Sequence, residues 1–152
     1  MDIEHLVAAA MERMGADVQK GALWRRLYWE EAGFAFVAEM TPDVAAALFD
    51  IAVDLGAAAA ARMLQRALNA LNREGKDHDD LRIDGIVGAR TLSAVGDCRR
   101  VRGRAGEALL LRMIEALRGS LCVLLAAKRP AQQGPLYEWL LRDVGARAIV
   151  CT

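Results

Sequence analysis

Residues 41–73 read TPDVAAALFDIAVDLGAAAAARMLQRALNALNR and carry the clearest helix signals in the chain. Thr41 supplies a capping hydroxyl, Pro42 suits the first helical position, and Asp43 places an acid in the first turn. Apolar residues then recur at helical spacing as far as Gly56, which predicts the end of this helix. The alanine-rich remainder repeats leucine at the same spacing. The stretch therefore predicts two consecutive helices.

The rest of the chain carries the same signals. Its 152 residues are 55% hydrophobic and only 5% aromatic, with three prolines, and Ala, Leu, Arg and Glu are strong helix formers. A length of this kind fits one domain with a single core. We expect an all-α fold, an irregular bundle of about six or seven helices. Further helices are predicted over about residues 2–14, 20–31, 89–95, 104–128 and 135–144, with a tail over 146–152.

Charge and hydropathy exclude two classes of partner. Twenty basic and twenty acidic residues cancel, so no long-range field would concentrate the chain on nucleic acid. The most hydrophobic stretch, residues 105–127, contains four charged residues, which a bilayer would not accept in one span. We interpret it as the central, most buried helix. The sequence thus predicts neither a nucleic-acid partner nor a membrane partner.

The chain also predicts a location and the absence of a metal. The acidic start, MDIEH, differs from the basic start of an export signal, so we expect synthesis in the cytoplasm. Three cysteines without a Cys-x-x-Cys pair suit a reducing compartment. Residues 74–82, EGKDHDDLR, predict a solvated loop. Although His78 stands among aspartates there, no second ligand set accompanies it, and we predict no metal and no cofactor.

One ordered set of residues predicts a rigid turn between two helices. Gln65 lies on the second helix of the opening stretch, and the turn IDGIVG follows at residues 83–88. Asp84 can bond to the backbone two residues further on, and Gly85 can adopt a positive φ. We expect Gly88 to let the turn pass close to a helix before Thr91 resumes helical structure.

This set resembles the "LQ…L…DG…G..T" signature of helical peptidoglycan-binding domains. The resemblance implies that Gln65, Asp84, Gly85, Gly88 and Thr91 form a peptidoglycan-binding site. The ligand implied is either the glycan or the stem peptide of the murein. By themselves, Asp-Gly would be a common turn and a helical glutamine would be solvated, so the prediction depends on the whole ordered set.

A wider resemblance covers about residues 20–145. Residues 23–29, LWRRLYW, are similar to the "IYRxxYW" segment of glycoside hydrolase family 108, the phage and prophage muramidases. Residues 48–56, LFDIAVDLG, resemble its "LFDxAVNxG", and residues 139–142, WLLR, resemble its "GWLxR". The resemblance implies a lysozyme-like helical domain, preceded by an amphipathic helix within residues 1–19.

The departures from this family concern catalysis. The family carries its catalytic glutamate in an N-terminal Glu-Gly-Gly, followed by "DPGGxTxxGI", and neither segment occurs in this chain. Asp54 replaces an asparagine of the family, and Glu138 replaces a glycine. Glycoside hydrolysis needs a carboxylic acid beside the leaving oxygen, usually with a second carboxylate. No pair is singled out among the remaining acids of this half, Glu30, Glu31, Glu39 and Asp50. We therefore predict no catalytic residue.

Two further expectations concern side chains outside the turn. Among the aromatic residues, Trp24 and Tyr28 share the apolar face of one helix, whereas Trp29 is the better candidate for stacking on a sugar. Asp50 and Asp54 are four residues apart on one helix face and repel each other. We expect an arginine to compensate them, chosen from Arg25, Arg26 and Arg62.

The sequence thus predicts a peptidoglycan-binding module that resembles the C-terminal part of a family 108 muramidase. It would act in the periplasm or cell wall once released from the cytoplasm. One alternative is a module that docks another protein, such as a chain supplying the missing catalytic segment. Another is a divergent muramidase with an unrecognised catalytic acid.

Overall fold

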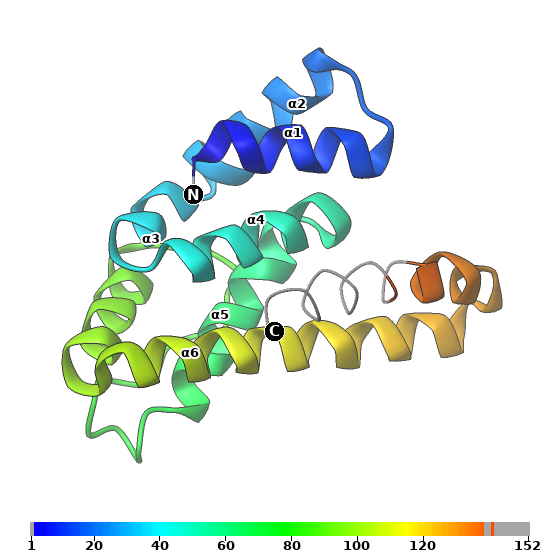
Figure 1. The fold of residues 1–152 in the computed structure, drawn as a ribbon. Coiled ribbons are helices and arrows are strands. Elements are labelled where there is room, and N and C mark those ends of the chain that lie inside the picture. Colours follow the sequence, from blue (N-terminus) through cyan, green and yellow to red (C-terminus); the bar gives the residue numbers. More distant parts are fainter. Residues whose placement is uncertain (1, 139–140, 142–152) are drawn as a thin grey trace, which may run out of the picture. The chain divides into compact units, whose positions relative to one another are not determined.

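The computed structural model describes residues 2–138 and residue 141 of the chain (Figure 1). Within them the structure is about 80% helical and has no strand, which confirms the predicted all-α class. Of the helix predicted over residues 135–144, residues 135–138 and 141 are described, and they are helical. The rest of that helix, including Trp139, Leu140 and Arg142 of the WLLR segment, and the predicted tail lie outside the described residues. The chain forms two compact units, residues 1–115 and 116–152, and each is described by itself.

Short connections join the helices except between α5 and α6, where residues 71–88 form a long one (Figure 1). Several boundaries lie where the sequence predicts them: α1 ends at Gly15, whose φ is +62°, and α4 begins at Pro42. Thr41 precedes that helix, but its side chain makes no capping hydrogen bond. The elements are α1 (Ile3–Met14), α2 (Val18–Arg25), the π-helical segment η1 (Arg26–Glu31), α3 (Phe34–Met40), α4 (Pro42–Leu55), α5 (Ala57–Ala70), α6 (Ala89–Lys128) and the 3₁₀ turn η2 (Pro130–Gln132).

Three elements differ from the expectation. The helix predicted over residues 20–31 changes to π-helical geometry in its second half, and α3 had no sequence signal that we recognised. The two helices predicted over residues 89–95 and 104–128 are both present and meet within α6. Gly103 separates them, with φ +61° and ψ −150°, a conformation open essentially to glycine alone.

The most buried elements of the first unit are α4 and α5, which pack against each other. Phe49, Leu48 and Ile51 of α4 are fully buried, as is Leu64 of α5. Alanines on the buried face of α5 permit a close approach of the two backbones, because they add little volume. This core holds α5 firmly in place, and α5 carries the central residue of the predicted site.

The prediction that residues 104–128 form the most buried helix is wrong. Leu110 and Ile114 are buried, but further along the same helix Leu124 is 56% exposed and Val123 is 62% exposed. Apolar periodicity identifies the face of a helix that tends to be covered. It does not show how far along the helix the cover extends.

An arginine does compensate the charges of Asp50 and Asp54, but it is Arg13 and not one of the three arginines that we expected. Arg13 of α1 places Nη1 3.4 Å from Oδ1 of Asp50 and Nη2 3.4 Å from Oδ1 of Asp54. Arg25, one of the arginines that we expected there, pairs instead with Glu4 and Glu30. The ion pairs therefore join α1 to α4, beside an apolar cluster that includes Trp24 and Phe49.

Candidate functional site

Gln65 is the centre of the predicted site. Gln65 is only 1% exposed, and its side-chain amide forms hydrogen bonds to the turn that follows the loop. Nε2 donates to Oδ1 of Asp84 at 2.9 Å, to the carbonyl oxygen of Ile86 at 3.0 Å and to Oγ1 of Thr91 at 3.2 Å. Oε1 accepts from the backbone N–H of Gly85 at 3.0 Å. One buried amide therefore connects α5, the turn and the first helical turns of α6.

Asp84 holds the turn from within. Its Oδ1 accepts the backbone N–H of Ile86 at 2.9 Å, which is the expected bond to the residue two positions further on. The hydrogen bond from Gln65 lowers the pKa of the Asp84 carboxyl most, and the bond from the Ile86 backbone lowers it further. Both donors favour the charged form. The site thus presents a carboxylate at neutral pH.

The two glycines of the turn have different roles. Gly85 has φ +79°, and a Cβ there would lie 3.2 Å from the carbonyl oxygen of Ala58 and 3.3 Å from the guanidinium of Arg62. At Gly88 a Cβ would meet no atom within 4 Å, so the close approach expected there is absent. The carbonyl oxygen of Gly88 accepts the N–H of Leu92 at 3.0 Å and starts the hydrogen bonding of α6.

A pocket of about 270 Å³ opens beside this turn. Four of the six predicted site residues line it, namely Gln65, Asp84, Gly88 and Thr91, and Gly85 joins them through its hydrogen bond to Gln65. Two exposed arginines, Arg82 and Arg90, also line the pocket. The rest of its lining is apolar and consists of Leu81, Ile86 and Ala89. We call this pocket the turn pocket.

Trp29, the sixth predicted site residue, lies in η1 and packs on the core. Its ring meets that of Phe49 edge to face, with the centroids 6.2 Å apart and the planes at 80°. It is partly buried against the apolar cluster at the N-terminal end of the first unit. Trp29 lines neither the turn pocket nor the loop pocket described next. A sugar-stacking role for this ring remains a prediction.

The loop before the turn is more ordered than the sequence suggested. Asn72 is buried, and its side chain accepts the backbone N–H of His78 at 2.9 Å and donates to Oδ1 of Asp80 at 2.8 Å. Asn69 bonds to the backbone of Leu81. Most of the loop is exposed, as predicted, but Asp77 and Leu81 within it are buried.

Asp77 is the buried charge of the loop. Its carboxylate pairs with Arg73 and accepts from Nε of Arg102 at 3.2 Å. The hydrogen bond from Arg73 is the largest cause of a lowered pKa at Asp77, and Arg102 lowers this pKa as well. Arg102 also donates to the carbonyl oxygen of Leu71 at 2.8 Å, so it fastens the loop to α6.

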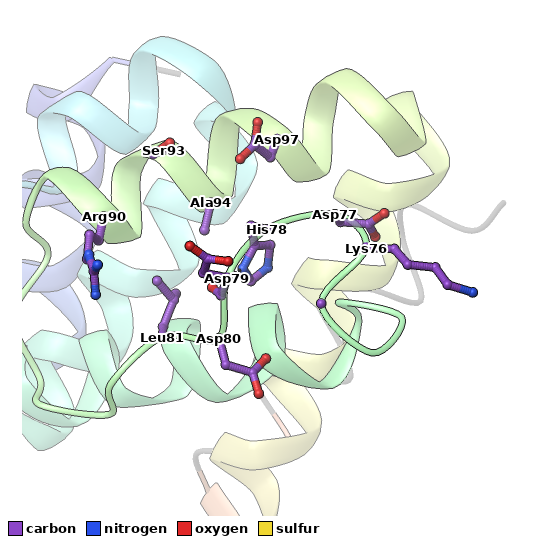
Figure 2. A pocket seen from close by; sticks show the side chains of 11 residues that line it. Lys76, Asp77, His78, Asp79, Asp80, Leu81, Arg90, Ser93, Ala94 and Asp97 are labelled. Carbon is purple, nitrogen blue, oxygen red and sulfur yellow. Dashed lines mark hydrogen bonds between the residues drawn. The ribbon is translucent and has the colours of Figure 1, made fainter.

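The loop and α6 enclose a second pocket of about 360 Å³, which we call the loop pocket (Figure 2). Figure 2 shows Asp79 in the middle of its side chains, while Lys76 extends away from them. Both ring nitrogens of His78 face backbone carbonyl oxygens, that of Asp79 at 2.8 Å and that of Leu68 at 3.3 Å. Among the described residues no group of three or more His, Cys, Asp or Glu side chains could hold a metal ion.

Sequence reasoning overlooked Asn69 and Asn72 as organisers of this region. The signal was available, because residues 65, 69 and 72 follow the i, i+4, i+7 spacing of one helix face. Three side-chain amides spaced along one face that also carries buried leucines are unusual, since a buried amide must be hydrogen-bonded. Gln65 and Asn69 on α5, together with Asn72 just beyond its end, bind the loop and the turn.

The acids considered as substitutes for a catalytic glutamate lie elsewhere. Glu30 and Glu31 are exposed on η1, each 3.6 Å from an arginine, Arg25 and Arg26 respectively. Glu39 is also exposed. These three glutamates line neither the turn pocket nor the loop pocket.

A family model described as a predicted peptidoglycan domain matches residues 59–144. The chain belongs to this family. The matched part of the peptidoglycan domain contains Gln65, the loop, the turn and both pockets. No curated protein matches the chain. In the part of the chain that the structure describes, no helix of the domain has the length and apolar character needed to cross a bilayer.

Proposed function

We propose that this chain is a peptidoglycan-binding module and that its ligand contacts the surface built around Gln65. The observation that carries the proposal is that the family match includes all of the hydrogen bonds that the side-chain amides of Gln65, Asn69 and Asn72 make to the loop and the turn. Gln65 uses both ends of its amide inside the protein, so its contribution is to fix the turn. The groups that remain accessible to a ligand are the exposed Asp84, Arg82 and Arg90. A pre-formed polar pocket of this kind loses little entropy on binding.

We further propose that the chain is related to the C-terminal part of family 108 muramidases and does not hydrolyse peptidoglycan by itself. The motifs at residues 23–29 and 48–56 support the relationship. The missing Glu-Gly-Gly supports inactivity, because without a positioned general acid the leaving oxygen departs unprotonated. General acid catalysis contributes about 10²–10⁴ in rate.

The test is co-sedimentation of the purified chain with insoluble murein sacculi, beside turbidity and reducing-end assays on the same sample. We expect the chain to pellet with sacculi and to leave their turbidity unchanged. Because the net charge is zero, binding should survive moderate salt better than that of a basic domain. Clearing that is lost in Glu30→Gln or Glu31→Gln would refute the inactivity, and failure to pellet at low and moderate salt would refute peptidoglycan binding.

A second candidate function is docking to another protein chain. It is favoured by the exposure of Val123 and Leu124, neighbouring apolar side chains on α6. Such residues are common at protein interfaces when they gather into a patch. Absence of sedimentation, together with a complex formed by the chain and a muramidase catalytic segment added in trans, would favour docking over murein binding.

Under either function, we propose that the chain acts in the cell wall after release from the cytoplasm.

A further inference from the structure

The turn pocket and the loop pocket adjoin each other. Leu81 and Arg90 line both of them, so these two residues stand at their common boundary. All of the lining residues belong to the loop, the turn, α5 and the first part of α6. Together the two pockets form one polar surface, which we call the paired pockets.

The α6 side of the paired pockets has opposite charges at its two ends. Arg90, Ser93, Ala94 and Asp97 line the loop pocket and follow the i, i+3, i+4, i+7 spacing of one helix face. Seven residues of helix span about 10 Å. Figure 2 shows Arg90 at one end of this face and Asp97 nearer the other. A ligand lying along α6 would therefore meet a cation first and an anion about two turns later.

Charges of both signs are available to a ligand there. Arg82 and Arg90 are exposed, and neither has an ion-pair partner among the described residues. The side chain of Asp79 is exposed as well, and no described residue bonds to its carboxylate. The other aspartates that line the pockets beside the loop are engaged. Arg102 and Arg73 hold Asp77, and Asn72 binds Asp80. Asp97 on α6 is paired with Arg100, whose Nη2 lies 2.9 Å from its Oδ1.

The same lining is poorly suited to a sugar ring. Sugar faces bind by stacking on aromatic side chains, which combine an apolar face with a polar edge. His78 is the only ring among the residues that line the paired pockets, and both of its nitrogens already face backbone carbonyl oxygens. The lining therefore favours a ligand that is charged rather than flat and neutral.

We propose that the paired pockets bind the stem peptide of peptidoglycan, with a peptide carboxylate at Arg82 and Arg90 and a free ammonium at Asp79. This inference rests on the proposed function and specifies its ligand. A stem peptide with a diamino acid carries both groups on one short chain, whereas the glycan strand offers no ammonium. Arginine suits the carboxylate because its guanidinium donates two parallel hydrogen bonds.

The first experiment separates peptide from glycan by competition. The chain is bound to sacculi, and either a purified stem peptide with a free side-chain amine or amidase-released glycan strands are added. We expect the peptide to release the chain and the glycan strands to leave it bound. Release by glycan strands alone, or by neither competitor, would overturn the inference and leave murein binding intact. A chain that never sediments would overturn murein binding itself.

The second experiment assigns the ends of the peptide by calorimetric titration. Arg90→Gln and Asp79→Asn should each weaken stem-peptide binding about 5- to 10-fold, as expected for one charged contact in a half-open pocket. The matched controls Arg66→Gln and Glu12→Gln change exposed charges outside the paired pockets and should stay within about twofold of the parent.

N-acetylation of the peptide amine isolates the ammonium contact. Acetylation should weaken binding to the parent chain about 5- to 10-fold and have almost no further effect on Asp79→Asn, since the two changes remove the same interaction. Additive losses would overturn the assignment of the ammonium to Asp79. Thermal melts of all variants check that each one is folded, and both mutated side chains are exposed and without described partners.

Discussion

The side chain of Asn69 and the backbone of Leu81 are joined by two hydrogen bonds that run in opposite directions. Nδ2 of Asn69 donates to the Leu81 carbonyl oxygen at 2.9 Å, and the Leu81 N–H donates to Oδ1 of Asn69 at 2.8 Å. The amide thus pairs with this buried residue as a neighbouring strand would. It fixes the chain at the point where the loop ends and the turn begins.

Replacing Asn69 by leucine should destabilise the fold by about 1–3 kcal/mol, because both backbone groups of Leu81 lose their partners. Asn69→Asp should also destabilise it, since a carboxylate cannot donate to the carbonyl oxygen. Urea unfolding measures both. Arg66→Gln on the exposed side of α5 serves as the control and should stay within about 0.5 kcal/mol. A parent-like midpoint for Asn69→Leu would show that the pairing contributes nothing.

Gly85 and Gly88 form a matched pair within one turn. Gly85→Ala should cost about 1–3 kcal/mol, because φ is positive there and the new methyl group meets the Ala58 carbonyl oxygen. Gly85→Val should cost more, since a β-branched residue resists positive φ. Gly88→Ala should change the free energy of unfolding by less than about 0.5 kcal/mol. Equal effects at the two positions would contradict the different roles of the two glycines.

The Asp84 carboxylate should make the stability of the domain dependent on pH in acid. Its pKa is lowered in the folded protein, so its stabilising contribution is complete above the unfolded-state pKa of about 3.9 and is lost as the pH falls through the folded-state pKa. Asp84→Asn should therefore lose less stability than the parent on acidification from pH 6. Melting temperatures at closely spaced pH values test this, with Gly88→Ala as the control. If the parent and Asp84→Asn lost the same stability between pH 6 and lower pH, the prediction would be refuted.

Two apolar residues of α6, Ile114 and Leu124, differ in burial and can be compared by the same substitution. Ile114 is fully buried, whereas Leu124 is 56% exposed. Ile114→Ala should cost about 2–5 kcal/mol through the lost contacts and the cavity left behind. Leu124→Ala should cost less than about 0.5 kcal/mol in the isolated chain. Denaturant midpoints compare the two, and a large loss at Leu124 would show that its side chain is covered in solution.

Features that depend on short-range geometry were predictable from the sequence. The glycine after α1, the proline at the start of α4 and the Asp-Gly turn each act through their own backbone torsions. Gln65, Asp84 and Thr91 were recognisable as a set because a known signature places them in order. Their hydrogen bonds then follow from the burial of the amide, which must find partners.

Features that depend on a distant partner were not predictable. The repulsion between Asp50 and Asp54 follows from their spacing, but only the packing of α1 on α4 shows that Arg13 relieves it. The order of the loop depends on Asn72 and Arg102, which lie outside it. The π-helical turn at η1 places Trp29 against Phe49, and its bonding pattern has no strong compositional signal.

The break at Gly103 divides the backbone of α6 after its first fourteen residues. Arg102 ties that stretch to Leu71 and Asp77, so the direction of Arg90 and Asp97 is set by the loop and α5. Beyond the break, α6 still belongs to the first unit as far as residue 115. Leu110 and Ile114 are buried there, and Glu107 pairs with Arg99 across the break. For protein engineering, a junction to a different C-terminal partner therefore belongs after residue 115, where the first unit ends, and not at the glycine.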